Sequence, residues 1–428
     1  MSNPLLIATK GKGFLPMLAR GRVITSRYGL TPRKMEGSLA ILIDTLNQYT
    51  CSATIPVTAS ALESNPKAIM KDSLLGLELA IHGLDHLDYS QLSLENQISH
   101  LHQARGIFER LGTKVTGFRC PYLRWNADTL TALKYCGFTY DSSQALALDV
   151  IEELSTDAYT RVLDFYRAQS AHDYPALPHL TNGLVRIPYC LPDDEALVDR
   201  LHLSNPTAMA EIWLEMLTST YQAGELFTLG LHPERIHLCQ AALKVVLEKA
   251  RTLSPCVWIA RLDEIAAWYL ALGETSFEIR HETRDLYHVK INAPARATIL
   301  VRSLGVMAST QPRGLDYHSV LTNDFTIQSN KRPLIGVSPN APLSLERFLR
   351  HQGYLFEISP ESQAYSYYID RSSFNPKDER PLLIELERGQ SPIVRISRWP
   401  DSAQCGLAIT GDVDAFTIWD YGRRIFTH

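Results

Sequence analysis

The first 270 residues alternate between short apolar runs and longer segments in which apolar residues recur every three or four positions. The longer segments predict amphipathic helices, because that spacing places the apolar side chains on one helix face. Capping residues precede them at Thr31-Pro32, Ser93, Asn126 and Asn205-Pro206, and a further helix is expected over 263–272. The short runs predict seven buried strands, over 52–57, 78–82, 117–121, 139–143, 184–190, 227–232 and 256–262. Strands that alternate with helices indicate an α/β fold with a parallel sheet, one strand short of a closed barrel.

The pattern changes after about Gly273. Residues 277–280, 286–291, 298–302 and 382–386 alternate apolar and polar side chains between turn-prone stretches, which predicts a mainly β, sandwich-like domain. A last apolar run over 405–410 again has the pattern of a buried strand and leads directly into Asp412 and Asp414. We therefore expect a barrel over 1–272, a β-rich domain over 273–400 and a C-terminal strand with an acidic motif over 401–428.

Composition excludes some classes of protein. The chain has 428 residues, of which 45% are hydrophobic, so it can build a sizeable core in two or three domains. Its net charge of −4 argues against a nucleic-acid partner held by overall positive charge. No run of 18 apolar residues is present, so we expect no membrane span.

The cysteines and the first residues bear on location. The seven cysteines are spread along the chain with no two closer than 16 residues, which argues against a disulfide framework and suits a reducing compartment. The apolar stretch over 4–8 is too short for the core of a secretory signal. We therefore expect a cytoplasmic protein.

Three polar motifs stand where predicted strands end. His82-Gly-Leu-Asp-His86 has two imidazoles four residues apart, and Gly83 argues for a turn that brings them together. The pair is either a metal site or a coincidence among 14 histidines. Arg119 needs a carboxylate partner, either in a structural ion pair or in a site. His232 is either a core histidine or a site residue. Strand ends of this kind are where barrels carry their active sites.

Asp412 and Asp414 form a fourth motif at the end of the last predicted strand. Two carboxylates at positions i and i+2 of an extended segment share a face, so one could bind a metal while the other acts as a base. The alternative is an ordinary acidic turn. The apolar residues Ala408 and Ile409 lead straight into the pair, as in a barrel strand.

Together these motifs resemble those of the polysaccharide deacetylase (NodB-homology) superfamily, carbohydrate esterase family 4. The family's H-[ST]-x-x-H motif is similar to His82-Gly-Leu-Asp-His86, with glycine in place of the hydroxyl residue. Its R-x-P-[YF] motif is similar to Arg119-Cys-Pro-Tyr122, and its late L-x-x-H motif to Leu229-Gly-Leu-His232. The stretch 53–57 also resembles the family's second strand, and the resemblance covers about residues 30–270.

The family's opening acidic motif has no counterpart before residue 50, and Asp412-Val-Asp414 is the one good candidate for it. The resemblance therefore implies a distorted (β/α) barrel of 7–8 strands that is circularly permuted, with its first strand at the C-terminal end. Permutation is physically reasonable because domain termini often lie close together. We expect residues 405–410 to lie parallel to the strand over 52–57, with the strand over 256–262 on the other side.

The resemblance implies a metal-dependent hydrolase that removes acetyl groups from an N-acetylated saccharide. His82, His86 and Asp414 would hold one divalent metal, for which Zn²⁺ suits the donor set and Fe, Co, Ni or Mn are alternatives. Asp412 would be the base, Arg119 would orient it, the backbone N–H of Tyr122 would stabilise the oxyanion, and His232 would protonate the leaving amine. Asp141 and Asp149 are both candidates for orienting His232.

Two other functions stay open at this point. The same fold could hydrolyse a non-sugar amide or a cyclic imide, as some relatives do. A non-catalytic carbohydrate-binding protein is the second alternative. The sequence indicates neither the glycan nor the oligomeric state.

Overall fold

Twelve strands form the largest sheet of the computed structural model, which describes residues 24–69, 76–148, 156–283, 285–312 and 316–426. Their bounds are β1 (Thr54–Val57), β2 (Glu78–Ile81), β3 (Gly117–Phe118), β4 (Tyr140–Asp141), β5 (Ala145–Ala147), β6 (Gln169–Ser170), β7 (His179–Thr181), β8 (Leu184–Arg186), β9 (Tyr189–Leu191), β10 (Leu226–Leu231), β11 (Val257–Ile259) and β23 (Cys405–Gly411). The strand order is β6-β5-β9-β10-β23-β1-β2-β3-β4-β8-β7, with β11 also paired to β23. Only β7 and β8 pair antiparallel. The prediction of a helix-covered parallel sheet is therefore confirmed, with more and shorter strands than the sequence indicated.

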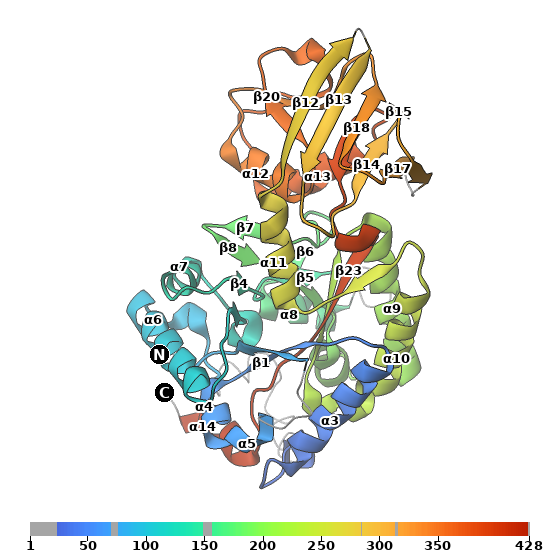
Figure 1. Ribbon diagram of the computed structural model, residues 1–428. Helices are drawn as coiled ribbons and strands as arrows, with labels where there is room; N and C mark the ends of the chain where they lie inside the picture. The colour runs from blue at the N-terminus through green and yellow to red at the C-terminus, as the bar shows by residue number, and fades with distance from the viewer. Residues whose placement is uncertain (1–23, 70–75, 149–155, 284, 313–315, 427–428) are drawn as a thin grey trace.

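Helices alternate with these strands and cover the sheet (Figure 1). The predicted caps are confirmed where side chains make them: Ser93 accepts from the N–H of Asn96, and Asn126 accepts from the N–H of Thr129. The helices are α3 (Arg33–Gln48), α4 (Ala59–Ser64), α5 (Pro66–Ile69), α6 (Leu94–Arg110), α7 (Ala127–Tyr135), α8 (Asp157–Tyr166), α9 (Pro206–Ala223), α10 (Ile236–Thr252), α11 (Leu262–Gly273) and α14 (Ile418–Phe426).

The late strand β23 lies in the middle of the sheet, between β10 and β1 (Figure 1). It runs parallel to both, with Thr410 opposite Thr54 of β1, and Cys405 opposite Val257 of β11. All seven of its residues are buried, as a strand covered on both faces requires. The expected parallel pairing of 405–410 with the strands over 52–57 and 256–262 is confirmed. The expectation that these two strands lie on opposite sides is wrong, because β10 pairs with one edge of β23 along six positions and β1 and β11 share the other edge.

The sheet curls strongly. Arg119, directly after β3, and Tyr189, in β9, are five strand positions apart in the sheet order, about 24 Å on a flat sheet with ~4.8 Å between strands. The guanidinium carbon of Arg119 nevertheless lies 4.6 Å from the centroid of the Tyr189 ring. The curl brings the carboxyl ends of distant strands to one place, which is what positions the site.

Residues 273–400 add three smaller sheets, in the orders β12-β13-β18-β15, β16-β17-β14-β22 and β20-β19-β21. The first two are antiparallel and the third is parallel. Two helices accompany them, so this part is less purely β than predicted. The bounds are β12 (Ser276–Thr283), β13 (Leu286–Asn292), β14 (Ile299–Arg302), β15 (Gly305–Val306), β16 (Thr310–Pro312), β17 (Tyr317–Val320), β18 (Asp324–Gln328), β19 (Arg332–Val337), α12 (Leu343–His351), β20 (Phe356–Ile358), β21 (Tyr365–Ile369), α13 (Pro376–Arg388) and β22 (Ile393–Ile396).

The strand predicted over 382–386 is wrong, because these residues lie inside α13. Leu382, Leu383 and Leu386 are its buried residues, and this i, i+1, i+4 spacing is that of one helix face. Asn375 caps the helix in a capping box with Asp378, a start signal that the sequence carries and that the strand interpretation overlooked.

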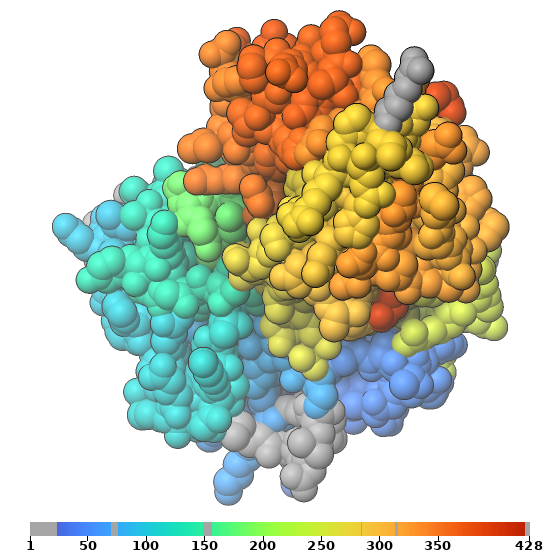
Figure 2. Space-filling model, turned by 45° about the horizontal axis from the view of Figure 1, so that its top comes forward, coloured from blue at the N-terminus to red at the C-terminus, as the bar shows by residue number. Residues whose placement is uncertain are grey.

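The added sheets pack on α11 and on the amino ends of the strands of the large sheet. One continuous apolar cluster includes Leu334 of β19, Leu262 of α11 and Leu226 at the start of β10. Arg380 of α13 also forms an ion pair with the buried Glu225. In the space-filling view the yellow-to-orange atoms of this part sit directly against the green and blue atoms (Figure 2). No helix in the described part of the chain is long and apolar enough to cross a membrane.

Candidate metal centre and active site

Four neighbouring or facing strands deliver the predicted site residues to one edge of the sheet. His82 directly follows β2, Arg119 follows β3, His232 follows β10, and Asp412 follows β23. Because β23 lies between β10 and β1, Asp412 stands between the strand ends that carry His232 and His82. The curled parallel sheet therefore assembles the four motifs at the carboxyl ends of its strands.

His82, His86 and Asp414 form a close triad. The Nε2 atoms of His82 and His86 lie 3.3 Å and 3.4 Å from Oδ1 of Asp414. A turn carries the second imidazole back to the first, and Gly83 makes that turn with a φ of +81°. A Cβ there would also meet the backbone oxygen of Asp85 at 2.8 Å. The hydroxyl residue of the family motif would therefore be strained in this turn, which explains the glycine.

The chemistry of the triad fits a divalent metal. Nδ1 of His82 is 3.0 Å from the carbonyl oxygen of Arg119, and a carbonyl oxygen only accepts hydrogen bonds. Nδ1 of His82 therefore carries the hydrogen, and Nε2, which faces the Asp414 carboxylate, is the ring atom that would bind a cation. Nitrogen and carboxylate donors that converge in this way suit a divalent metal, and a backbone partner that fixes the histidine tautomer is typical of metal ligands.

Asp412 makes a buried ion pair with Arg119, at 2.6 Å between Oδ1 and Nη1. The guanidinium is completely buried and also donates to Oγ1 of Thr410, and to the carbonyl oxygen and the hydroxyl of Ser142. Burial raises the pKa of Asp412, but the charges of Arg119, His82 and His232 and the hydrogen bond from Arg119 together outweigh burial and leave that pKa below its ordinary value. Asp412 is therefore ionised at neutral pH, as a proton acceptor must be.

His232 is held by Asp194, a residue that the sequence analysis missed. Oδ1 of Asp194 accepts from Nδ1 of His232 at 2.7 Å, and its Oδ2 accepts from the backbone N–H of His232 at 2.7 Å. Burial lowers the pKa of His232, but the buried carboxylate of Asp194 more than offsets this and raises that pKa to about 10. The imidazole is therefore protonated at neutral pH and can act as an acid.

Neither aspartate proposed for orienting His232 is shown to do so. Asp141 instead forms a buried ion pair with Arg186 at 2.6 Å, and Asp149 lies outside the described residues. The sequence contained a feature that could have pointed to Asp194, because Asp193 and Asp194 come just after the end of the buried strand β9 and Pro192. That strand was merged with β8 into one predicted run over 184–190, which hid the strand end.

Asp193, Asp194 and His232 also lie close enough to form a second possible metal site. Their contacts argue against one. Asp193 accepts from the hydroxyl of Tyr189 and the N–H of Ala196, both at 2.7 Å, and Asp194 is bound twice to His232. These carboxylate oxygens already have donors, so the group is a hydrogen-bonded support for His232.

Tyr122 closes another side of the site. Its ring meets the His86 ring edge to face, with 4.3 Å between the centroids. Its backbone adopts a φ of +57°, in the left-handed region that non-glycine residues seldom occupy. Strained backbone of this kind clusters at functional sites, because the surrounding structure must hold it in place.

Comparison with known proteins agrees with this geometry. Residues 34–140, which include the triad histidines and Arg119-Cys-Pro-Tyr122, match the family model described as polysaccharide deacetylase. This segment is therefore similar to the polysaccharide deacetylase family. The chain is also 31% identical over 114 residues to the peptidoglycan deacetylase-like protein FGM2 of Gibberella zeae. That match covers 26% of this chain and 34% of the relative, so the chain spans about a third of the length of that relative.

Parts of the chain are also similar to solved structures. Puue allantoinase is similar with a TM-score of 0.44 and 19% identity, over 54% of this chain and 72% of that chain. A family 4 carbohydrate esterase from Streptomyces lividans in complex with acetate is similar with a TM-score of 0.25 and 19% identity, over 36% of this chain and 71% of that chain.

Proposed function

We propose that the protein is a metal-dependent hydrolase that removes N-acetyl groups from an N-acetylated saccharide. The observation that carries this proposal is the convergence of three groups of side chains at one edge of the sheet. The Asp412–Arg119 ion pair and the His232–Asp194 pair lie at the same strand ends as the triad of His82, His86 and Asp414. A carboxylate and an imidazole that are each fixed by a charged partner suit a base and an acid that act together.

The triad supports a metal ion in this proposal. A Zn²⁺ ion bound by His82, His86 and Asp414 would lower the pKa of a bound water toward ~7 and polarise the acetyl carbonyl. The residues that perform the proton transfers are then Asp412 and His232.

The chain's own residues would act in sequence. Asp412 takes a proton as the water oxygen forms its bond to the acetyl carbon, while Arg119 keeps the carboxylate in position. The backbone N–H of Tyr122 donates to the developing oxyanion, a contribution typically worth about 2.7–4 kcal/mol per donor. His232 gives its proton to the nitrogen as the C–N bond breaks, which yields acetate and a free amine. Asp194 supports the imidazolium until that step.

We further propose that the deacetylase fold is circularly permuted, with 401–428 completing a barrel formed by 1–272, and with 273–400 as an inserted β-rich domain. The support is the place of β23 between β1 and β10, and its delivery of both acidic residues to the site.

The test is an acetate-release assay on N-acetylglucosamine oligomers, run beside a cyclic imide and a simple amide, with metal content measured on the same samples. Acetate release that needs about one bound metal per chain supports the proposal. Turnover of the imide alone would place the activity on a non-sugar substrate, and saccharide binding without any turnover would indicate a non-catalytic protein.

A further inference from the structure

The acid His232 faces a second carboxylate besides that of Asp194. Because Nδ1 of His232 is held by Asp194, Nε2 is the ring nitrogen that can give its proton to the substrate. Oε2 of Glu195 lies 3.9 Å from this Nε2 atom. That distance is too long for a hydrogen bond, but a substrate nitrogen about 2.9 Å from each atom fits between the two. Glu195 therefore stands where the leaving nitrogen receives its proton.

The backbone around Glu195 is fixed by its neighbours. Oδ1 of Asp193 accepts a hydrogen bond from the backbone N–H of Ala196 at 2.7 Å, which starts the short helical turn over 196–200. Glu195 directly precedes this turn. On its other side, Asp194 is bound twice to His232. Asp193 and Asp194 therefore place Glu195 beside the acid.

Two guanidinium groups hold the Glu195 side chain. Nη2 of Arg200 lies 2.9 Å from Oε1, and Nη2 of Arg235 lies 3.9 Å from Oε2. Arg200 is itself fixed, with its guanidinium carbon 4.1 Å from the centroid of the Phe165 ring. Arg235 forms an ion pair with Asp199 at 2.7 Å. Because positive charges this close favour the ionised form of a carboxylate, Glu195 is a fixed negative charge next to the acid.

The carboxylate of Glu195 is also within reach of a ligand. Its side chain is 20% exposed, whereas the side chains of Asp194 and Glu234, two other carboxylates near His232, are 0% and 3% exposed. Glu234 forms an ion pair with Nη1 of Arg235 at 2.7 Å. Of these three carboxylates, Glu195 is the one that combines a short distance to Nε2 of His232 with access from solvent.

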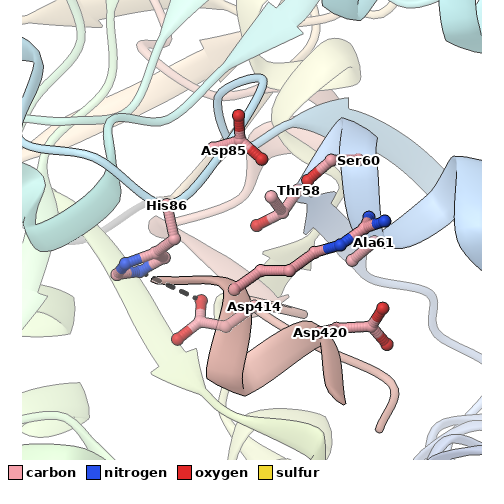
Figure 3. Close-up of a pocket in the computed structure, with 8 residues that line it drawn as sticks. Thr58, Ser60, Ala61, Asp85, His86, Asp414 and Asp420 are labelled. Atoms are coloured by element: carbon pink, nitrogen blue, oxygen red, sulfur yellow. Dashed lines mark ion pairs between the residues drawn. The ribbon is translucent and has the colours of Figure 1, made fainter. Parts of the chain in front are cut away.

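The leaving group has its space on the Glu195 side of the metal triad. In the sheet, β23 separates β1 and β2 from β10 and β9, so His86 and Glu195 follow strands on opposite sides of β23. The pocket beside His86, which Thr58 and Arg423 also line, has room for about one water molecule (Figure 3). A leaving group cannot fit there, and it therefore lies toward His232 and Glu195.

The proposed hydrolysis creates a positive charge at this place. His232 gives one proton to the nitrogen as the C–N bond breaks. The water loses two protons as acetate forms: one returns His232 to its protonated form, and the other converts the released amine to ammonium. Imidazolium and ammonium then lie side by side and repel each other. A carboxylate within reach of both offsets that repulsion.

We infer that Glu195 is a further catalytic residue, whose carboxylate binds the leaving nitrogen as it becomes an ammonium group. Hydrogen bonds from an ammonium group to a carboxylate are charge-assisted and therefore strong. The site consequently prefers the amine product to a neutral analogue of the same shape. The inference rests on the proposed hydrolysis of an amide, since that reaction leaves an amine here, but it does not depend on which saccharide carries the amine.

The experiment compares the binding of glucosamine and glucose to the full-length protein by titration calorimetry at about pH 6, where the amino group is charged. The wild-type protein should bind glucosamine roughly tenfold more tightly than glucose, the effect of one hydrogen bond to a charged group. Glu195→Gln should remove this preference, whereas Glu195→Asp, which keeps the charge, should retain part of it. Glu63→Gln is the matched control, because Glu63 pairs with Arg110 on the surface and is 55% exposed. The ratio of the two affinities is taken within each variant, so a partly unfolded variant still gives a valid ratio.

Inhibition of turnover by the two products gives a second measurement. Glu195→Gln should raise the inhibition constant of glucosamine by roughly tenfold and leave that of acetate, which has no positive charge, unchanged. If no amide is hydrolysed but glucosamine binds with a preference that needs Glu195, the binding of the cation stands and the reaction does not. If acetate is released but the preference is absent from the wild-type protein or persists in Glu195→Gln, the reaction stands and the role of Glu195 is refuted.

Discussion

Replacing Asp412 by asparagine tests the base and the buried ion pair in one variant. The amide keeps the shape of the carboxylate but accepts no proton and carries no charge. Arg119 is 0% exposed, and its remaining contacts, to Thr410 and Ser142, are neutral. A buried guanidinium that loses its carboxylate costs about 3–5 kcal/mol. We expect turnover to be lost and the melting temperature to fall by roughly 5–10 °C.

The matched control is Asp401→Asn, which removes a carboxylate from Arg296 on the surface. The Asp401 side chain in this ion pair is 57% exposed. Exposed ion pairs contribute about 0–1 kcal/mol to the free energy of unfolding. Acetate release, metal analysis and melting curves are measured on both variants and on Asp414→Asn. Asp412→Asn should keep its metal, whereas Asp414→Asn should bind metal more weakly, because a neutral amide is a poorer ligand. Loss of the metal from Asp412→Asn alone would reverse the two roles, and full activity in both would refute the proposed site.

Three further changes test other parts of the site. His232→Ala should reduce kcat far more than metal content, and metal analysis showing an empty variant would make His232 a ligand instead. Asp194→Asn should move the alkaline limb of the kcat/KM profile from near pH 10 to below neutrality, because burial alone lowers the pKa of His232; an unchanged limb would exclude His232 as the acid. The raised pKa of His232 stabilises the folded protein fully below the unfolded-state pKa of ~6.5, and this stabilisation is lost as pH rises through about 10. The wild-type protein should therefore lose stability between these pH values, whereas Asp194→Asn should not. Moving 401–428 ahead of residue 24 through a short linker should preserve metal binding and activity if the barrel is permuted, and an unfolded or metal-free product would count against permutation.

The sequence predicted those parts of the fold that local rules determine. The helices α6 and α7 have capping side chains and one-sided apolar faces, so their starts could be placed to the residue. Strands such as β6, with two residues, exist only because distant partners pair with them, and no local pattern shows them. For the same reason the sequence pattern merged β8 and β9 into one predicted strand, which hid Asp194. The misplaced strand in α13 arose because adjacent leucines fit both periods over a short window.

The candidate site was predictable to a greater extent, because its residues follow strand ends. His82, Arg119, His232 and Asp412 each come directly after an apolar run, and parallel strands bring such positions to one edge. The contact between Asp412 and Arg119 joins residues 293 positions apart, which only the sheet order reveals. The pocket lined by Thr58, Asp414 and Arg423 could not be predicted, because these residues come to one place only through the fold.

The position of β23 also affects how the chain is made. A ribosome synthesises β1 and β10 long before β23, yet in the finished sheet β23 separates them. Until the last residues emerge, both of these central strands present unpaired backbone edges, which are sites for mispairing and aggregation. Before residue 412 is synthesised, the nascent chain also lacks Asp412 and Asp414. It can therefore form neither the ion pair with Arg119 nor the triad with His82 and His86. Catalytic competence would thus arise in a single late step, and a product truncated before residue 405 would be both inactive and dependent on chaperones.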